Sequence, residues 1–191
     1  MLKRERNFFK TPIDVTNDYK MQDILSEDKK NFESTKKWLY LGADYVNKNY
    51  AKVGITMGDL KSRSYSSANP NFYIFCAFKC KHDITEEQLK RIESEVLKFL
   101  DRCYTDDDGA TKRMSHFESK RSSECYNDID FMDFFVNLHE ELYKNHSNYF
   151  LISGFKDEYG DDMGEFLDCE FNSRIPKHKA YKFKLKLTQY T

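Results

Sequence analysis

A tyrosine, a lysine and an arginine occur in one short segment, where together they could act on a phosphate group. Tyr40 lies in the run WLYLG, Lys52 begins the run KVGIT, and Arg63 follows. A phenol that loses its proton can act as a general base, while ammonium and guanidinium groups neutralise phosphoryl oxygens. The two cations would suit an anionic ligand such as a phosphate group, with the phenol beside it.

The two runs around these residues predict a β-hairpin. Both contain short apolar or β-branched stretches, and residues 44–49 between them are rich in Asn and Asp, which favour turns. Gly54 stands inside the second predicted strand, where a glycine indicates a bulge or the close approach of another group to the backbone. The hairpin and the residues that follow it would carry Tyr40, Lys52 and Arg63 to one place.

Further elements are expected as helices at residues 19–32, 59–67, 85–100 and 129–143 and as a strand at residues 72–79. Thr85 and Gln88 have the spacing of a capping box, and apolar residues recur at helical spacing in the last two helices. The helix at 85–100 carries Glu93, a candidate metal ligand. Residues 104–123 are polar and mildly basic, and we expect them to form a loop beside the active face.

In these motifs the sequence resembles the GIY-YIG endonuclease superfamily, named for two short motifs on adjacent strands. The first motif is written here as Leu39-Tyr40 and the second as Lys52-Val53-Gly54. The pattern is similar to a branch common in phage and virus proteins, in which a Thr, an Arg and a Glu follow in order, as Thr56, Arg63 and Glu93 do here. The resemblance covers residues 37–143, including the triplet ECY at 124–126, which resembles the branch's Glu-Trp-Phe.

The resemblance implies an α+β fold, with a small three-stranded antiparallel sheet flanked by helices, and metal-dependent cleavage of DNA. It assigns catalytic roles to Tyr40 as the base, Lys52 in place of the second tyrosine, Arg63 on the phosphoryl oxygens and Glu93 as the ligand of Mg²⁺ or Mn²⁺. Gly54, Thr56 and Tyr65 are then expected at the substrate. The enzyme would be encoded by a phage or mobile element.

Each of these residues also has a structural interpretation. Tyr40 could be a core tyrosine, Lys52 and Arg63 could be solvated surface charges, and Glu93 could pair with a lysine of its own helix. Glu95 is a rival to Glu93 as the functional carboxylate. The second functional hypothesis is therefore a non-catalytic module with this fold that binds nucleic acid or a partner protein.

The end of the chain separates its charges. Residues 157–170 hold acids without Lys or Arg, and residues 174–186 hold bases without acids. Apolar residues alternate with Lys182, Lys184 and Lys186, which predicts a strand at 181–187, paired with residues 148–155 as a C-terminal β-hairpin. These lysines would either protect a sheet edge or bind phosphates. The acidic segment would offer a surface to a protein partner.

Composition sets broader expectations. The chain has 191 residues and a net charge of −1, which fits one domain at 37–143 with an extension at 1–36 and an appendage at 144–191. Five cysteines argue against a disulfide framework, and Cys76 and Cys80 are expected as buried thiols rather than zinc ligands. The absence of a signal-peptide or membrane-spanning pattern predicts a cytoplasmic protein. DNA is the expected partner and RNA the alternative, and cleavage of both strands would need a homodimer.

Overall fold

The computed structural model describes residues 19–34, 36–60, 69–156 and 159–188 of the chain. It divides the chain into two compact units, Met1–Glu33 and Ser34–Thr191. The first unit contains helix α1 (Tyr19–Glu33), as the helical pattern predicts. The helix expected at 59–67, with Arg63 and Tyr65, falls largely outside the described residues.

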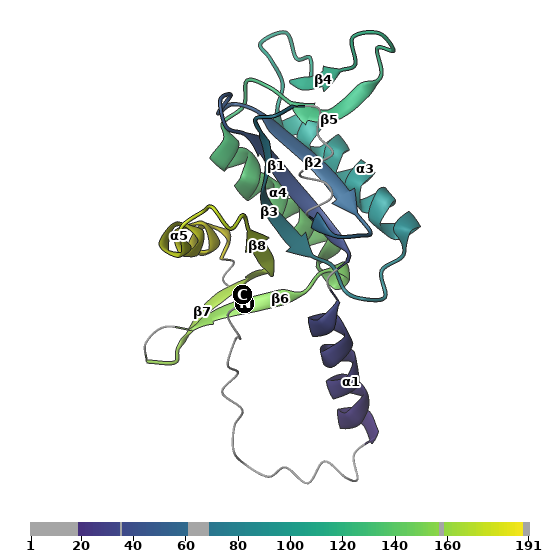
Figure 1. The fold of residues 1–191 in the computed structure, drawn as a ribbon, viewed down its shortest axis with the longest axis vertical. Helices are drawn as coiled ribbons and strands as arrows, with labels where there is room; N and C mark the ends of the chain where they lie inside the picture. Colours follow the sequence, from purple (N-terminus) through teal and green to yellow (C-terminus); the bar gives the residue numbers. More distant parts are fainter. Residues whose placement is uncertain (1–18, 35, 61–68, 157–158, 189–191) are drawn as a thin grey trace. The chain divides into compact units, whose positions relative to one another are not determined.

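An antiparallel sheet of six strands forms the centre of the second unit, in the order β4-β5-β2-β1-β3-β8 (Figure 1). Its strands are β1 (Trp38–Asp44), β2 (Ala51–Thr56), β3 (Phe72–Lys79), β4 (Arg113–Ser115), β5 (Ser122–Tyr126) and β8 (Cys169–Phe171). The three predicted strands are confirmed as its middle, and the fold is α+β as expected. The prediction of a three-stranded sheet is wrong, because β4, β5 and β8 extend both edges and are too short to show an alternating pattern.

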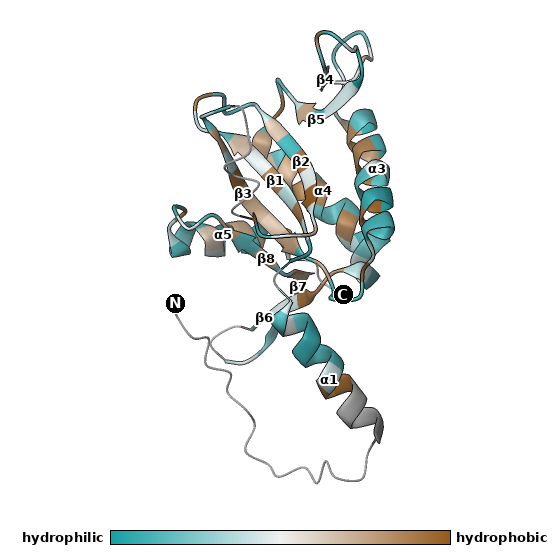
Figure 2. Cartoon of the chain, turned by 45° about the vertical axis from the view of Figure 1, so that its right-hand side comes forward, coloured by the Kyte–Doolittle hydropathy of each residue, from teal (hydrophilic) through white to brown (hydrophobic). Residues whose placement is uncertain are grey.

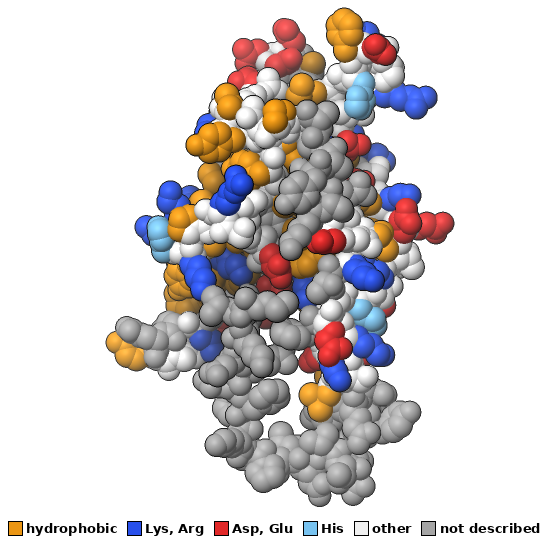
Figure 3. All heavy atoms as spheres, viewed as in Figure 1, with side chains coloured by type: hydrophobic (Ala, Val, Ile, Leu, Met, Phe, Trp, Pro, Cys, Tyr) orange, Lys and Arg blue, Asp and Glu red, His pale blue; other side chains and the backbone are white. Residues whose placement is uncertain are grey.

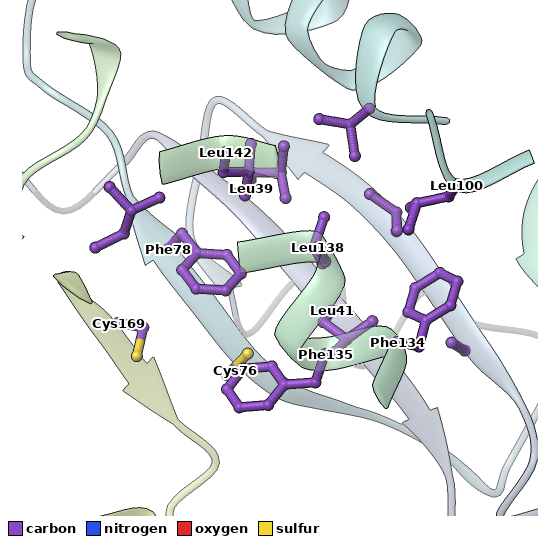
Figure 4. Packing of buried hydrophobic residues seen from close by; sticks show 14 of the residues in the cluster. Leu39, Leu41, Cys76, Phe78, Leu100, Phe134, Phe135, Leu138, Leu142 and Cys169 are labelled. Atoms are coloured by element: carbon purple, nitrogen blue, oxygen red, sulfur yellow. The ribbon is translucent and has the colours of Figure 1, made fainter. Parts of the chain in front are cut away.

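Two helices cover one face of this sheet. They are α3 (Glu86–Cys103) and α4 (Phe131–His146), and their buried residues share one core with Leu39, Leu41 and Phe78. Figure 2 shows apolar residues on the sheet and on the helices that cover it, and Figure 4 shows Phe134, Phe135 and Leu138 of α4 lying against the sheet, with Phe135 close to Cys76 of β3. The helical spacing seen in the sequence therefore marks the buried sides of both helices.

Both helices begin at a side-chain cap, and the cap of α3 is the one that the sequence predicts. Thr85 Oγ1 accepts a hydrogen bond from the Gln88 amide at 3.2 Å, and Gln88 Oε1 accepts one from the Thr85 amide at 2.8 Å. This is the predicted capping box, which satisfies amides that the first helical turn leaves unpaired. In α4 the Asp130 side chain accepts from the Asp133 amide at 2.8 Å.

A β-bulge in β3 adjusts which residues reach the core. Leu41 is paired with Cys76, but its neighbour Gly42 is paired with Ile74, so Phe75 is the extra residue. Phe75 and Cys76 consequently both belong to the core under the helices, whereas Ile74 and Ala77 lie on the opposite face. The expected burial of Cys76 and Cys80 is confirmed.

The C-terminal region differs from its prediction. The strand expected at 181–187 is a helix, α5 (Lys177–Leu187), and the hairpin instead joins β6 (Ile152–Lys156) to β7 (Asp162–Leu167) after a short 3₁₀ turn, η2 (Ser147–Tyr149). The strand that pairs with β6 is therefore β7, which belongs to the acidic segment and is closer to β6 in the sequence than residues 181–187 are. Lysine and leucine are good helix formers, and Pro176 at the N-cap favours a helix start, so the same residues form α5.

In the part of the chain that the structure describes, no helix is both long and apolar enough to cross a membrane.

Candidate functional site

The hairpin of β1 and β2 brings four of the predicted site residues to one face of the sheet. Tyr40 is paired with Gly54, Trp38 with Thr56 and Gly42 with Lys52. Directly opposed residues in an antiparallel pair point to the same side, and every second residue shares that side. We call the side that carries Trp38, Tyr40, Lys52, Gly54 and Thr56 the Tyr40 face; it is opposite to the face covered by α3 and α4.

Tyr40 lies directly against the backbone of Gly54. A Cβ atom added to Gly54 would lie 2.5 Å from both Cζ and Oη of Tyr40, so close that one of the two groups would have to shift. The interpretation of Gly54 as a point of close approach is therefore confirmed, and the approaching group is the phenol. The Tyr40 side chain is 6% exposed and packs with Trp38 and Ile74.

Lys52 stands beside this phenol and is half-buried. Its Nζ atom lies 6.0 Å from the centroid of the Phe72 ring, within the range of a cation–π contact. The Phe72 ring in turn covers Gly42, where an added Cβ would lie 2.2 Å from the ring. The aromatic ring thus limits where the Lys52 ammonium group can go.

Thr56 is buried, and its hydroxyl oxygen accepts a hydrogen bond from the Gly58 amide at 3.1 Å. This bond shapes the turn that follows β2, so Thr56 has a structural role there. Its hydroxyl proton can still be donated to another group.

Sequence reasoning missed Lys79, a second cation on the Tyr40 face. Lys79 is paired with Trp38, its side chain is only 8% exposed, and its Nζ atom lies 6.0 Å from the centroid of the Trp38 ring. The bulge at Phe75 shifts the alternation of β3, so the sequence pattern alone does not place Lys79 here. Two lysines, Lys52 and Lys79, therefore share the face with Tyr40.

The far end of the Tyr40 face carries a buried carboxylate that was also missed. Asp44 accepts hydrogen bonds from the amides of Asn47 at 2.8 Å and Val46 at 2.7 Å and from Asn69 Nδ2 at 2.6 Å. The bonds from Asn47 and Asn69 hold the pKa of Asp44 below its usual value, so this group stays ionised. Its acceptor sites are used to shape the turn after β1.

A tyrosine and a cysteine close this end of the face. Tyr50 Oη donates to Cys125 Sγ at 3.0 Å, and Cys125 is the residue paired with Lys52 on β5. Burial, and then the bond to Cys125, raise the pKa of Tyr50 far above its ordinary value. Burial likewise raises the pKa of Tyr73. These two phenols therefore remain neutral.

Glu93 lies on α3, and its side chain is half-buried. The apolar side of α3 packs on the face opposite to Tyr40. However, β5 pairs only with Ala51 and Lys52 of β2. Among the described strands, the rest of β2 is therefore an open edge of the sheet, and α3 contacts β2. Arg63 and Tyr65 are outside the described residues, and the meeting of Tyr40, Arg63 and Glu93 in one cleft stays a prediction.

The three tail lysines lie on a different surface. Lys182, Lys184 and Lys186 belong to α5, whose Phe183 packs against Phe75 and Phe171 in the core. The expected row of lysines along a strand is therefore wrong, because residues that alternate in a strand are spread around a helix.

A metal ion would have few protein ligands here. The structure, over the residues it describes, contains no group of three or more His, Cys, Asp or Glu side chains that could hold a metal ion. A site built on one carboxylate such as Glu93 fits Mg²⁺, since this ion keeps several waters and often takes only one or two carboxylates in addition to substrate phosphates.

Comparison with known proteins found no matching family model, no matching curated protein and no matching solved structure.

Proposed function

We propose that the chain is a metal-dependent endonuclease that hydrolyses phosphodiester bonds of DNA. The observation that supports this proposal best is the position of the Tyr40 phenol against Gly54, with Lys52 on the same face. The two motifs of the resemblance lie on adjacent paired strands, as the GIY-YIG pattern requires. Glycine at position 54 leaves room for the phenol that the proposed chemistry needs.

In the proposed reaction, Tyr40 takes the proton of the attacking water. An ordinary phenol has a pKa of about 10, so this role needs nearby positive charge to favour the phenolate form. Lys52 and Lys79 supply such charge on the Tyr40 face, and Arg63 is assigned to the non-bridging phosphoryl oxygens. Cations next to the phosphate also stabilise the charge that develops in the transition state.

A Mg²⁺ or Mn²⁺ ion bound by Glu93 would supply Lewis-acid stabilisation of the phosphate and the leaving oxygen. Glu93 would approach the Tyr40 face around the edge of β2 that β5 leaves unpaired. Its half-buried position on α3 favours a fixed carboxylate over a freely moving one.

The test is the nicking of supercoiled plasmid with Mg²⁺ or Mn²⁺ and with a chelator as control. Glu93→Gln and Arg63→Ala should abolish metal-dependent nicking, whereas Glu95→Gln, at an exposed position of α3, should retain it. Loss of nicking in Glu95→Gln but not in Glu93→Gln would refute the assignment of Glu93. Nicking that persists in the chelator would refute metal dependence.

One observation favours a second candidate function. Tyr40 is only 6% exposed and packs with Trp38 and Ile74, as a purely structural tyrosine would. The second candidate is a non-catalytic module that binds nucleic acid or a partner protein. This candidate predicts that the chain cleaves neither DNA nor RNA but still binds nucleic acid or a partner protein. Tyr40→Phe should leave that binding unchanged.

A further inference from the structure

Helix α5 presents a row of lysines to solvent. Lys179, Lys182 and Lys186 are all exposed, and their spacing of three and four residues places them on one side of the helix. We call these three residues the α5 lysine stripe. Figure 3 shows the blue side chains and a histidine gathered over α5, on the left of the view.

The other side of α5 is occupied by the core. The Phe183 ring lies 5.3 Å from the Phe75 ring and 5.7 Å from the Phe171 ring, measured between centroids, and Leu187 is fully buried. Lys184 belongs to this packed side, since its Nζ atom lies 5.3 Å from the centroid of the Phe166 ring and its side chain is half-buried. The helix is therefore held with the α5 lysine stripe facing outwards.

No acidic residue of α5 itself offsets the charge of the stripe. The sequence from Arg174 to the C-terminus contains no Asp or Glu. Within the described part of the chain, ion pairs form on α1, on α3, on α4 and at the β4–β5 hairpin, and none of them involves a lysine of α5. Several unpaired cations on one surface attract a polyanion.

The dimensions of the stripe fit a nucleic-acid backbone. Lys179 and Lys186 are seven residues apart, which is about 10 Å along a helix, and one DNA strand carries a phosphate about every 3.4 Å of its axis. An anionic membrane is less suitable, because a helix that binds a bilayer inserts a continuous apolar side. In α5, Phe183 and Leu187 pack in the core, and only Tyr181 and Leu185 remain as exposed large apolar residues.

We infer that the α5 lysine stripe binds the phosphate backbone of nucleic acid, as an anchoring surface separate from the Tyr40 face. This inference rests on the proposed function in one respect, since both take nucleic acid as the ligand. It assigns Lys184 to packing, and it gives the stripe no part in the chemical step.

The test measures binding of the full chain to a labelled DNA duplex of about 20 base pairs by fluorescence anisotropy. Chelator is present, so that binding is measured without metal-dependent cleavage, and salt is varied. The stripe variant is K179Q/K182Q/K186Q, and the control K90Q/K98Q/K144Q removes the same charge from exposed positions on α3 and α4. Three lost phosphate contacts should reduce the slope of log affinity against log salt by about 3 and weaken binding at least about tenfold at low salt.

The control variant should bind as the natural chain does. Equal slopes and affinities in the stripe and control variants, or no binding of DNA by the natural chain, would overturn the inference. Binding of phosphatidylserine vesicles, but not of DNA, would also overturn it in favour of a membrane surface. If stripe-dependent binding occurs but the chain never nicks plasmid, the inference stands and the nuclease proposal fails. If the stripe variant nicks plasmid with an unchanged KM and binds DNA as the natural chain does, the nuclease proposal stands and the inference about the stripe fails.

Discussion

The contact between Tyr40 and Gly54 connects a sequence signal to a chemical position. A glycine in a strand usually weakens it, and replacement with alanine usually adds about 0.5–1 kcal/mol of stability. At Gly54 the added methyl group would collide with the Tyr40 ring at 2.5 Å. Tyr40 is only 6% exposed and packs in one cluster with Trp38 and Ile74, so its ring has little room to move away.

We therefore predict that Gly54→Ala lowers the free energy of unfolding by about 1–3 kcal/mol, the usual cost of overpacking. Gly58→Ala is the matched control, because its added methyl group would meet only Thr56 Oγ1 at 3.9 Å. It should change stability by no more than about 0.5 kcal/mol. Urea unfolding measures both, and equal stabilities for the two variants would contradict the position of Tyr40.

His139 connects the stability of the fold to pH. It is fully buried on α4, its Nε2 atom accepts a hydrogen bond from the Leu167 amide at 3.0 Å, and burial lowers its pKa to about 3. In the unfolded chain a histidine has a pKa of about 6.5. Unfolding therefore takes up a proton below pH 6.5, and the stability from neutral His139 is present above that pH and lost as the pH falls.

Because His139 takes up a proton on unfolding, the free energy of unfolding should fall by about 1.4 kcal/mol for each unit by which the pH is lowered from pH 6 to pH 4.5. His139→Gln cannot take up the proton and can still accept from Leu167, so its stability should depend less on pH by that slope. Urea unfolding at several pH values tests this. A variant with the same pH slope as the natural chain would show that His139 is not the titrating group.

At the scale of elements, the sequence predicts what is local and periodic. The strand at 72–79 and the capped helix that follows Thr85 could be predicted because their own residues carry the alternation, the caps and the helical spacing. The strand predicted at 181–187 is wrong because lysines alternating with apolar residues suit a strand or a helix equally. Whether residues 181–187 form a strand depends on whether β6 is free to pair with them. In the structure β6 pairs with β7, which follows it more closely in the sequence.

The β4–β5 hairpin depends on a polar anchor that no local pattern reveals. Asp101, on α3, accepts from Arg113 Nη1 at 3.0 Å, from Tyr126 Oη at 2.8 Å and from Thr111 Oγ1 at 3.0 Å. The Tyr126 side chain is fully buried. Without the carboxylate, the Tyr126 hydroxyl would keep only its bond to the Leu97 carbonyl, and Arg113 would lose its ion pair.

We predict that Asp101→Ala lowers the unfolding free energy by about 2–4 kcal/mol, because it leaves Arg113 Nη1, on a partly buried side chain, without its acceptor and removes one bond of the buried Tyr126 hydroxyl. It should also speed hydrogen exchange of the amides in β4 and β5. Asp107→Ala, at an exposed position in the preceding loop, should have little effect on either measurement. Similar exchange rates in both variants would argue against the anchor.

At the scale of the whole molecule, the candidate site is predictable only where it lies within one hairpin. Tyr40, Lys52, Gly54 and Thr56 share a face because two neighbouring strands pair in the expected register. Lys79 and Phe72 join them through a bulge in β3, which no sequence pattern reveals. The position of Glu93 depends on how α3 packs along β2, and that is a property of the assembled core.

The most direct test of the central claim is the single-turnover nicking rate of Tyr40→Phe with Mg²⁺ and saturating enzyme. The change removes only the hydroxyl that is proposed to act as base, and Tyr73→Phe removes a half-buried hydroxyl from a neighbouring strand as a control. General-base catalysis predicts a rate at least about 100-fold lower for Tyr40→Phe, with an unchanged melting temperature and a normal rate for Tyr73→Phe. A Tyr40→Phe variant that nicks as fast as the natural chain would contradict the account.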